Sequence, residues 1–365
     1  METDPKPVKE GTGMTAPTTP ETHQTRGGQG SATEESRGSR IKAVLLRQDV
    51  LLLGVLVLMV AFFTVLNPLF FTPFAVANIM QDWAPVMLLA IAETFVVITG
   101  GIDLSVGSTL GLSGVACAMT MHSLHQSGVG PTTTILAGVV AALVTGMAVG
   151  LVNGLLITRA KLAPFIATLA TMGAGAGLTL VLTGGVQIAG GPPSVLWLGN
   201  TQYADLLTLP LIVVLAVLAL TWIVLGLTRF GRWTYAIGSN SFSALGAGIG
   251  VDAHLMKIYP LSGFLAGVAG LFVYFRLGSG SPTSGQGQEL AAIAAAVIGG
   301  TSLFGGSGRM SGTVLGALIT TSVLSGLILI GVAPNWQQVV IGALIAIAVG
   351  VQQVHLRTGK GSGRA

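Results

Sequence analysis

Charged residues are scarce in this sequence, and so are cysteine and recognisable catalytic motifs. Only 8% of the 365 residues are charged, against about 25% in an average soluble domain. Hydrophobic residues make up 51% and the mean hydropathy is +0.80. This balance excludes an ordinary soluble domain and indicates an integral membrane protein. The formal net charge of +4 is too small and too scattered to indicate nucleic-acid binding.

The missing motifs exclude several kinds of chemistry. Cys117 is the only cysteine, so no intramolecular disulfide or cysteine-based zinc cluster can form. The histidines are scattered and none lies in an HExxH pattern. The only Gly-Lys pair near a phosphate-loop pattern, at residues 359–361, lacks the required spacing. We therefore expect a non-catalytic chain without metal or cofactor.

Apolar segments dominate the chain from residue 50 onward. With 53 glycines, they favour helices that approach one another closely, as in a packed polytopic bundle. The predicted fold class is all-α, with about ten transmembrane helices of roughly 20 residues each. We place them at residues 50–70, 84–100, 103–121, 132–157, 164–183, 206–227, 258–278, 289–303, 310–332 and 337–352. The region at residues 71–82 is predicted as a re-entrant or interfacial piece.

The two ends of the chain are polar. Residues 1–39 are rich in Thr, Pro, Gly, Ser and charge, which predicts a disordered cytoplasmic tail. Residues 40–356 form the predicted membrane domain, and residues 357–365 a short cytoplasmic tail. The first apolar run lacks a cleavage pattern, so we expect it to remain as a membrane anchor.

Basic residues provide an independent test of topology, because cytoplasmic loops collect Lys and Arg. With a cytoplasmic N-terminus, the outside loops hold only Arg276. This asymmetry predicts an even number of spans with both termini in the cytoplasm. The inside segments hold Arg40, Lys42, Arg47, Arg159, Lys161, Arg229, Arg232, Lys257, Arg309, Arg357, Lys360 and Arg364.

The stretch ITGGIDLSVGSTLGLSGV, residues 98–115, interrupts two apolar segments. The sequence predicts a turn in which Gly100 and Gly101 end one helix and Asp103 or Ser105 caps the next. Irregular backbone at membrane depth is tolerated only where protein or a water-lined path surrounds it. The stretch is therefore also a candidate hinge or gate.

A second copy of this pattern indicates an internal repeat. The pattern GG-x5-G-[ST]-x-L-G begins at Gly100 and again at Gly305. Both copies start at a predicted cytoplasmic loop and lead into an apolar segment, as the halves of a duplicated transporter would. Chance similarity in a glycine-rich chain is the alternative.

Two further features carry candidate functions. Glu93 lies near the middle of an apolar segment, where a carboxylate needs a partner or an aqueous path. It is a candidate for substrate contact, or a hydrogen-bonded residue of the bundle interior. The loop at residues 228–257 contains SFSALGA, which predicts a short helix capped by Asn240 or Ser241. The aromatic residues of this loop indicate a folded element packed against the bundle or a partner.

Four stretches resemble one family. They are TGGIDLSVGSTLGLSG at residues 99–114, GLVNGLLITRAKLAPFIATLATM at 150–172, YAIGSN at 235–240 and GQELAAIAAAVIGGTSLFGGSGRMSGTVLGAL at 287–318. They are similar to the permease subunits of bacterial ABC importers for monosaccharides of the ribose, xylose and galactose type. The chain departs from that family at Leu245, where an arginine is usual.

The resemblance implies a permease in the bacterial plasma membrane, paired with a second copy or a paralogous permease. It implies a cytoplasmic ATPase that uses the ATP, and an external binding protein that delivers a small sugar. The coupling contacts to the ATPase are then Gly238, Asn240, Ser241, Phe242, Leu245 and Gly248. The candidate pathway or gate residues are Glu93, Gly100, Gly101, Asp103, Ser105 and Asn153.

Two other functions remain open from sequence. A self-sufficient secondary transporter or channel would need an ion or proton site among Glu93 and Asp103. An ABC permease for another solute, such as an amino acid, would share the general plan. The sequence does not name the cargo.

Overall fold

A computed structural model describes residue 1 and residues 48–203, 206–333 and 335–361. The chain divides into a unit of residues 1–44 and a unit of residues 45–365, and the fold below is that of the second unit. The predicted tail at residues 2–39 lies outside the described residues. Of the predicted C-terminal tail, residues 357–361 continue the last helix and the rest lies outside the described part.

Each predicted apolar segment corresponds to a helix, so the described part of the chain is largely helical as predicted. The helices are α2 (Gln48–Leu66), α3 (Pro73–Ile98), α4 (Val106–Gln126), α5 (Pro131–Thr158), α6 (Pro164–Thr183), α8 (Leu209–Leu227), α11 (Val251–Leu277), α12 (Gln288–Ile298), α13 (Met310–Leu329) and α14 (Asn335–Gly361). The shorter elements are η1 (Pro68–Phe71), α7 (Ser194–Asn200), α9 (Arg229–Ser239), α10 (Ser241–Gly246) and the two-residue strands β1 (Ile188–Ala189), β2 (Gln202–Tyr203), β3 (Leu207–Thr208) and β4 (Ser279–Gly280). β1 pairs antiparallel with β4, and β2 with β3.

Seven helices of the described residues are long and apolar enough to cross a membrane: α2, α3, α5, α6, α8, α11 and α13. α12 and the stretch Asn335–Gly350 of α14 are shorter apolar helices, and α4 is not among the seven. The chain is thus a polytopic helical membrane protein. The count of ten spans and the internal duplication stay predictions.

Two helices begin earlier than hydropathy predicts. Thr72 caps α3 by accepting a hydrogen bond from the Ala75 amide at 3.3 Å, and Pro73 occupies the first helical turn. Residues 73–82 are therefore the first turns of α3 and not a separate element, and their re-entrant or interfacial placement in the membrane stays a prediction. α11 begins at Val251, so the polar turn before residue 258 is helical and not part of the loop.

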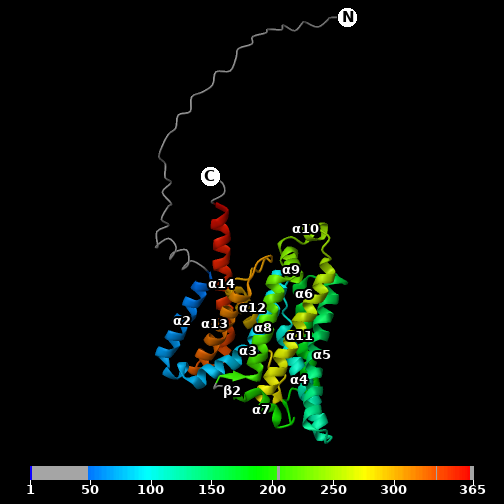
Figure 1. Cartoon of the computed structure of the whole chain (residues 1–365), viewed down its shortest axis with the longest axis vertical. Coiled ribbons are helices and arrows are strands. Elements are labelled where there is room, and N and C mark those ends of the chain that lie inside the picture. The colour runs from blue at the N-terminus through cyan, green and yellow to red at the C-terminus, as the bar shows by residue number, and fades with distance from the viewer. Residues whose placement is uncertain (2–47, 204–205, 334, 362–365) are drawn as a thin grey trace, which may run out of the picture. The chain divides into compact units, whose positions relative to one another are not determined.

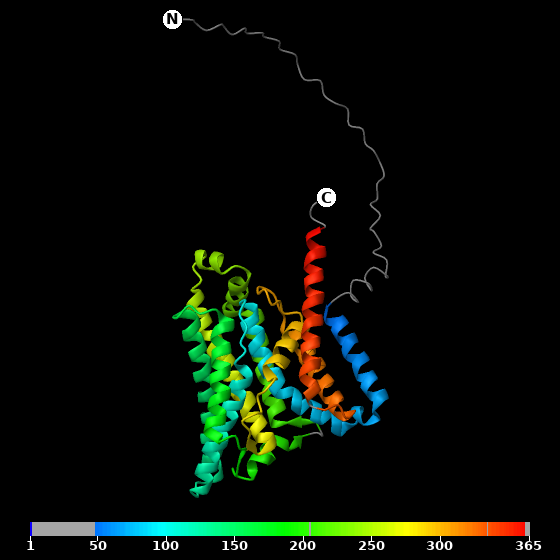
Figure 2. The same ribbon diagram turned by 180° about the vertical axis from the view of Figure 1, so that it is seen from behind.

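α3 and α11 form the centre of the bundle. Within its most apolar stretch α11 is 78% buried and α3 is 61% buried, whereas α2 is only 6% buried and lies at the edge. Figures 1 and 2 show α4, α5 and α6 on one side of this centre and α12, α13 and α14 on the other. The main hydrophobic core includes Leu89 and Phe95 of α3, Leu110 of α4, and Tyr259 and Leu265 of α11.

Glycines allow α5 and α11 to approach closely, as composition predicts. A Cβ on Gly263 of α11 would overlap the Gly146 carbonyl oxygen of α5. Conversely, a Cβ on Gly146 would overlap the Gly263 carbonyl oxygen and lie 2.8 Å from the Gly267 Cα. Backbone-to-backbone packing of this kind is how small residues hold membrane helices together.

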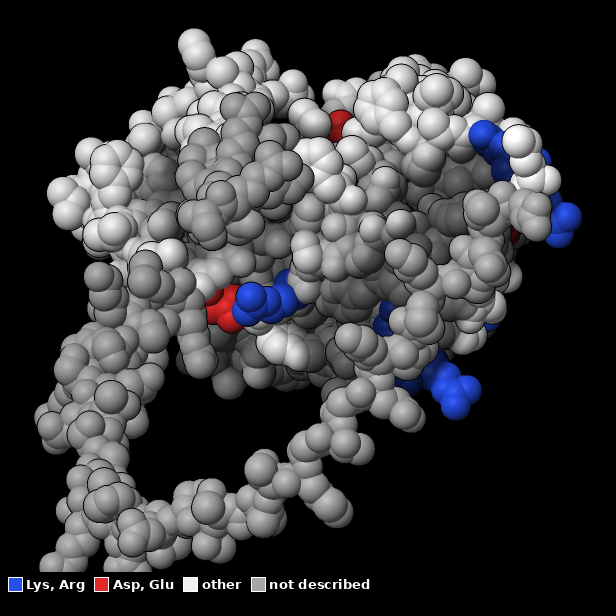
Figure 3. Space-filling model, turned by 90° about the horizontal axis from the view of Figure 1, so that it is seen from above, with Lys and Arg blue, Asp and Glu red and all other residues white. Residues whose placement is uncertain are grey.

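One end of the bundle carries basic side chains. α9 and α10 lie at one end, called the α10 end, together with the start of α2 and the last described turns of α14 (Figures 1 and 2). α7 lies at the opposite end, called the α7 end. Viewed toward the α10 end, several Lys and Arg side chains stand at the surface and few Asp or Glu (Figure 3).

Replacing Gly263 by valine should destabilise the bundle by about 1–3 kcal/mol, because the added side chain must displace the α5 backbone. A lower Tm in detergent, followed by size-exclusion chromatography, measures this effect. Gly173→Val is the matched control, because a Cβ at Gly173 meets open space and the substitution should change the Tm little. An unchanged Tm for Gly263→Val would contradict the close packing.

Candidate functional site

The turn after α3 follows the predicted geometry. α3 ends at Ile98, and Gly100 adopts a φ of +84°, a conformation that glycine takes without strain. The Gly100 amide donates to the Val97 carbonyl at 2.9 Å, and the Gly101 amide to the Val96 carbonyl at 3.2 Å. This pair of bonds is a Schellman helix end. Gly101 is required by space, since a Cβ there would lie 2.6 Å from the Tyr259 hydroxyl.

Asp103 is buried in the loop between α3 and α4. Its Oδ1 accepts hydrogen bonds from the Ser105 amide at 3.0 Å and the Ser105 hydroxyl at 2.6 Å. Its Oδ2 accepts one from the Ser262 hydroxyl of α11 at 2.7 Å. Ser105 occupies the N-cap position of α4, but its side chain makes no capping bond to the helix. Ser105 thus lies at one of the two predicted cap positions, but its hydroxyl donates to the Asp103 carboxylate and does not cap the helix.

Asn153 of α5 extends this network to α6. Its Nδ2 donates to the Ser105 hydroxyl at 2.8 Å and lies 3.5 Å from the Asp103 Oδ1. Its Oδ1 accepts a hydrogen bond from the Thr171 hydroxyl of α6 at 2.6 Å. The structure thus brings together three residues named from sequence. We call the five residues Asp103, Ser105, Asn153, Thr171 and Ser262 the Asp103 network.

Sequence reasoning missed Ser262 and Thr171. Serine and threonine are common in membrane helices, where their hydroxyls usually bond to the carbonyl four residues earlier. Thr158 and Thr179 do so in this bundle. Nothing in the spacing of Ser262 separates it from such residues. Its partner lies 159 residues away in sequence and is brought close only by the fold.

Glu93 lies outside the Asp103 network. Its side chain is fully buried within α3, and neither carboxylate oxygen makes a hydrogen bond to a described residue. The buried Tyr259 hydroxyl likewise has no partner among the described residues. A buried polar group without a hydrogen-bond partner costs free energy. A water molecule or a polar side chain that moved within reach of Glu93 or Tyr259 would therefore be stabilised there.

The two glycine-pair loops meet at the α10 end. The Gly306 amide donates to the Ile98 carbonyl at 2.8 Å, and a Cβ on Gly305 would lie 3.0 Å from the Gly100 nitrogen. Gly238, near the end of α9, completes the contact: a Cβ there would overlap the Ile98 carbonyl oxygen. Three chain segments therefore touch through backbone atoms, and the contact requires glycine at positions 238 and 305.

A short helix projects from this junction, as predicted. Asn240 is its N-cap, and the Asn240 Oδ1 accepts a hydrogen bond from the Ser243 amide at 2.9 Å. α10 ends at Gly246, and Gly248 follows with a φ of +81°. Phe242 is 85% exposed and Leu245 is 61% exposed. Two large apolar side chains are thus exposed on a helix of six residues.

α9 fastens α10 to the bundle. The Thr234 hydroxyl lies 2.9 Å from the His254 Nε2 of α11, and the Tyr235 hydroxyl donates to the Gly308 carbonyl at 2.9 Å. Partial burial raises the pKa of the Tyr235 hydroxyl, and the nearby charge of Arg309 acts in the opposite direction. Through these contacts, a displacement of α10 would reach the glycine loops.

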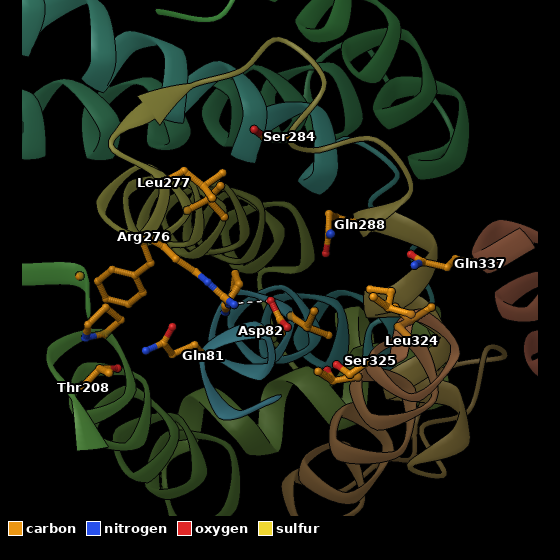
Figure 4. Close-up of a pocket in the computed structure, with 18 residues that line it drawn as sticks. Gln81, Asp82, Thr208, Arg276, Leu277, Ser284, Gln288, Leu324, Ser325 and Gln337 are labelled. Carbon is orange, nitrogen blue, oxygen red and sulfur yellow. Dashed lines mark hydrogen bonds and ion pairs between the residues drawn. The ribbon is translucent and has the colours of Figure 1, made fainter. Parts of the chain in front are cut away.

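A cavity of about 360 Å³ lies toward the α7 end. Its walls come from α3, α11, α12 and α13, with further residues from the starts of α8 and α14 (Figure 4). A second cavity of about 300 Å³ lies among α4, α6, α12 and α14. Sequence reasoning did not identify either cavity, because each is assembled from segments far apart in the chain.

Comparisons with known proteins agree on one kind of protein. A family model described as "Branched-chain amino acid transport system / permease component" matches residues 75–349. The ribose import permease protein of Bacillus subtilis is 44% identical over 265 residues, which cover 72% of this chain and 80% of that protein. The D-allose transport system permease protein of Escherichia coli is 37% identical, covering 73% and 79%.

An autoinducer 2 import system permease protein of Yersinia pseudotuberculosis is also 37% identical, over 64% of each chain. No solved structure matches the chain.

Proposed function

Because the chain belongs to the branched-chain amino acid transport system / permease component family, we propose that it forms the membrane pathway through which an importer takes up a monosaccharide or similar small polyol. The chain is a permease, a non-catalytic transport subunit, and a multi-pass protein of the bacterial plasma membrane. The proposed cargo rests on the high sequence identity to permeases named for ribose and allose.

The proposed importer is ATP-driven and has further subunits. A cytoplasmic ATPase binds at α10, whose exposed Phe242 and Leu245 offer apolar side chains to a partner. With the α10 end in the cytoplasm, the basic residues of that end follow the positive-inside rule. A binding protein delivers the sugar at the α7 end, and a second copy of the chain or a paralogue completes the pathway.

The Asp103 network and the glycine loops form the proposed inner gate. The contact between Gly306 and Ile98 closes the α10 end, and Asp103 ties the adjoining turn to α5 and α11. Movement of the ATPase would pull α10 and α9, and Gly238 would transmit the movement to the Ile98 carbonyl. This arrangement suits a gate that opens when a neighbouring helix shifts.

Uptake by reconstituted transporter tests the proposed function. Vesicles containing this chain, its ATPase and its binding protein should take up D-ribose or D-allose when ATP is supplied, and L-leucine much less. Uptake of leucine but no sugar would favour the amino-acid alternative. Sugar uptake by the permease alone, driven by an ion gradient, would contradict an ATP-driven importer and favour a secondary transporter.

Asp103→Ala should leave membrane insertion intact and reduce uptake about ten- to hundredfold, because hydrogen bonds to a charged group contribute roughly 1.5–3 kcal/mol. Radiolabelled uptake, normalised to the amount of inserted protein, measures the loss. Ser127→Ala is the control, since Ser127 is exposed beyond α4 and bonds only to the Ser123 carbonyl. Normal uptake by Asp103→Ala would show that the loop has only a structural role as a turn.

Phe242→Asp should weaken ATPase binding on the order of tenfold or more, because an anchoring aromatic side chain is replaced by a charge. Titrating purified ATPase against the permease in detergent gives the Kd. Ser127→Asp places the same charge after α4 and should leave the Kd unchanged. Equal Kd values for all three proteins would show that α10 is not the docking element.

A further inference from the structure

The chain between α11 and α12 enters the bundle without helical structure. α11 ends at Leu277, β4 follows, and residues 282–287 form turns before α12 begins at Gln288. α12 has 11 residues, or about 16 Å of helix, roughly half of a hydrocarbon core about 30 Å thick. Irregular backbone at such depth is stable where it lines protein or a cavity. Here Ser284 and Gln288 line the 360 Å³ cavity toward the α7 end.

Opposite charges balance within this cavity. The Arg276 guanidinium of α11 forms an ion pair of 2.5 Å with the Asp82 carboxylate of α3 (Figure 4). Because each charge is compensated, the pair offers donors and acceptors without a strong net charge. The cavity therefore does not favour an anion or a cation over a neutral ligand.

Two residues of the cavity wall each carry a buried polar atom without a partner. The Gln288 Oε1 and the Thr321 Oγ1 are buried and make no hydrogen bond to a described residue. Thr321 is only 2% exposed. Its neighbours on α13 behave differently, since Thr313 and Thr320 donate to the carbonyls of Arg309 and Gly316 in their own helix. Leaving such groups unpaired costs free energy, which a hydroxylated ligand would recover.

Apolar side chains complete the walls. Phe272 of α11 is 6% exposed, and it lines the cavity together with Pro85 and Val86 of α3. A sugar ring presents both hydroxyl groups and faces of C–H groups, so it needs polar and apolar walls together. The volume of about 360 Å³ lies within the range of about 300–1,000 Å³ of small-molecule pockets.

We propose that this cavity is a binding site for a neutral polyol inside the permease, in which the side chains of Gln288 and Thr321 rotate to hydrogen-bond the ligand hydroxyls and Phe272 packs against the ligand ring. The proposal rests on the sugar-import function proposed above and adds a site at which the permease itself contacts its cargo. It also assigns discrimination to the membrane subunit, because a ligand without hydroxyls would leave both polar atoms unpaired.

Two substitutions of similar shape test this site. Gln288→Leu and Thr321→Val each remove one hydrogen bond, and each should lower ATP-dependent D-ribose uptake by about three- to tenfold in the complete reconstituted transporter. ATP hydrolysis stimulated by the binding protein should stay at the wild-type rate, because the ATPase contacts lie at the other end. Thr320→Val, a change at the neighbouring threonine that bonds within its own helix, should leave uptake unchanged.

A second measurement detects the ligand directly and covers the case in which a variant folds poorly. Cys117 is the only cysteine, so Ser325→Cys in a Cys117→Ala background places one reactive thiol in the cavity wall. D-ribose should slow its reaction with a maleimide several-fold in the permease–ATPase complex without binding protein. Ala176→Cys, which lines the second cavity, should react at the same rate with or without sugar.

The outcomes separate the two proposals. Wild-type vesicles that import no sugar would overturn the proposed function. Wild-type uptake with unchanged rates for Gln288→Leu and Thr321→Val would overturn the binding site alone. An unchanged labelling rate at Ser325→Cys in the presence of D-ribose would also overturn it, whatever the variants show.

Discussion

The Asp103 carboxylate is removed from solvent, and therefore it must find its hydrogen-bond donors inside the bundle. It receives them from Ser105 and from Ser262, while Asn153 holds Ser105 in place. These donors belong to α5, α11 and the turn after α3, so the positions of the three are tied to one another. A shift of any one helix along its axis would leave a charge or an amide unpaired. Such an arrangement favours a few discrete states over continuous deformation.

Contacts between backbones extend this constraint to the surface. Gly238 touches the Ile98 carbonyl, and Gly306 donates a hydrogen bond to the same carbonyl oxygen. The contact is made by backbone atoms, so a change of side-chain rotamer cannot compensate for a movement of α9. Tyr235 and Thr234 fix α9 on its other sides. A continuous physical path thus runs from the exposed face of α10 to the loop that carries Asp103.

Hydropathy predicted where the helices lie, because burial in lipid demands long apolar stretches. It failed at two helix starts for an identifiable reason. Asn78, Gln81 and Asp82 lower the hydropathy of the first turns of α3, and the polar residues Asp252, His254 and Lys257 do the same for α11. Cap residues such as Thr72 fix these boundaries more sharply than composition does.

The candidate site was predictable in part. A charge that interrupts apolar segments is visible in the sequence, which is how Asp103 was identified, and Asn153 was named only as one of the candidate pathway residues. Hydroxyl partners such as Ser262 and Thr171 were not identified, since their role depends on which helix faces which. The same holds for the cavity near the α7 end, where Gln288 and Thr321 meet only after α12 and α13 have packed.

The shortness of α12 also bears on how the chain is built into the membrane. A helix of 11 residues is well below the roughly 20 apolar residues that partition into a bilayer as an independent unit. Its alanine-rich faces pack between α3 and α13, where Ala292 and Ala295 are fully buried. We therefore expect α12 to enter the membrane together with the helices it packs against, and not as an independent unit.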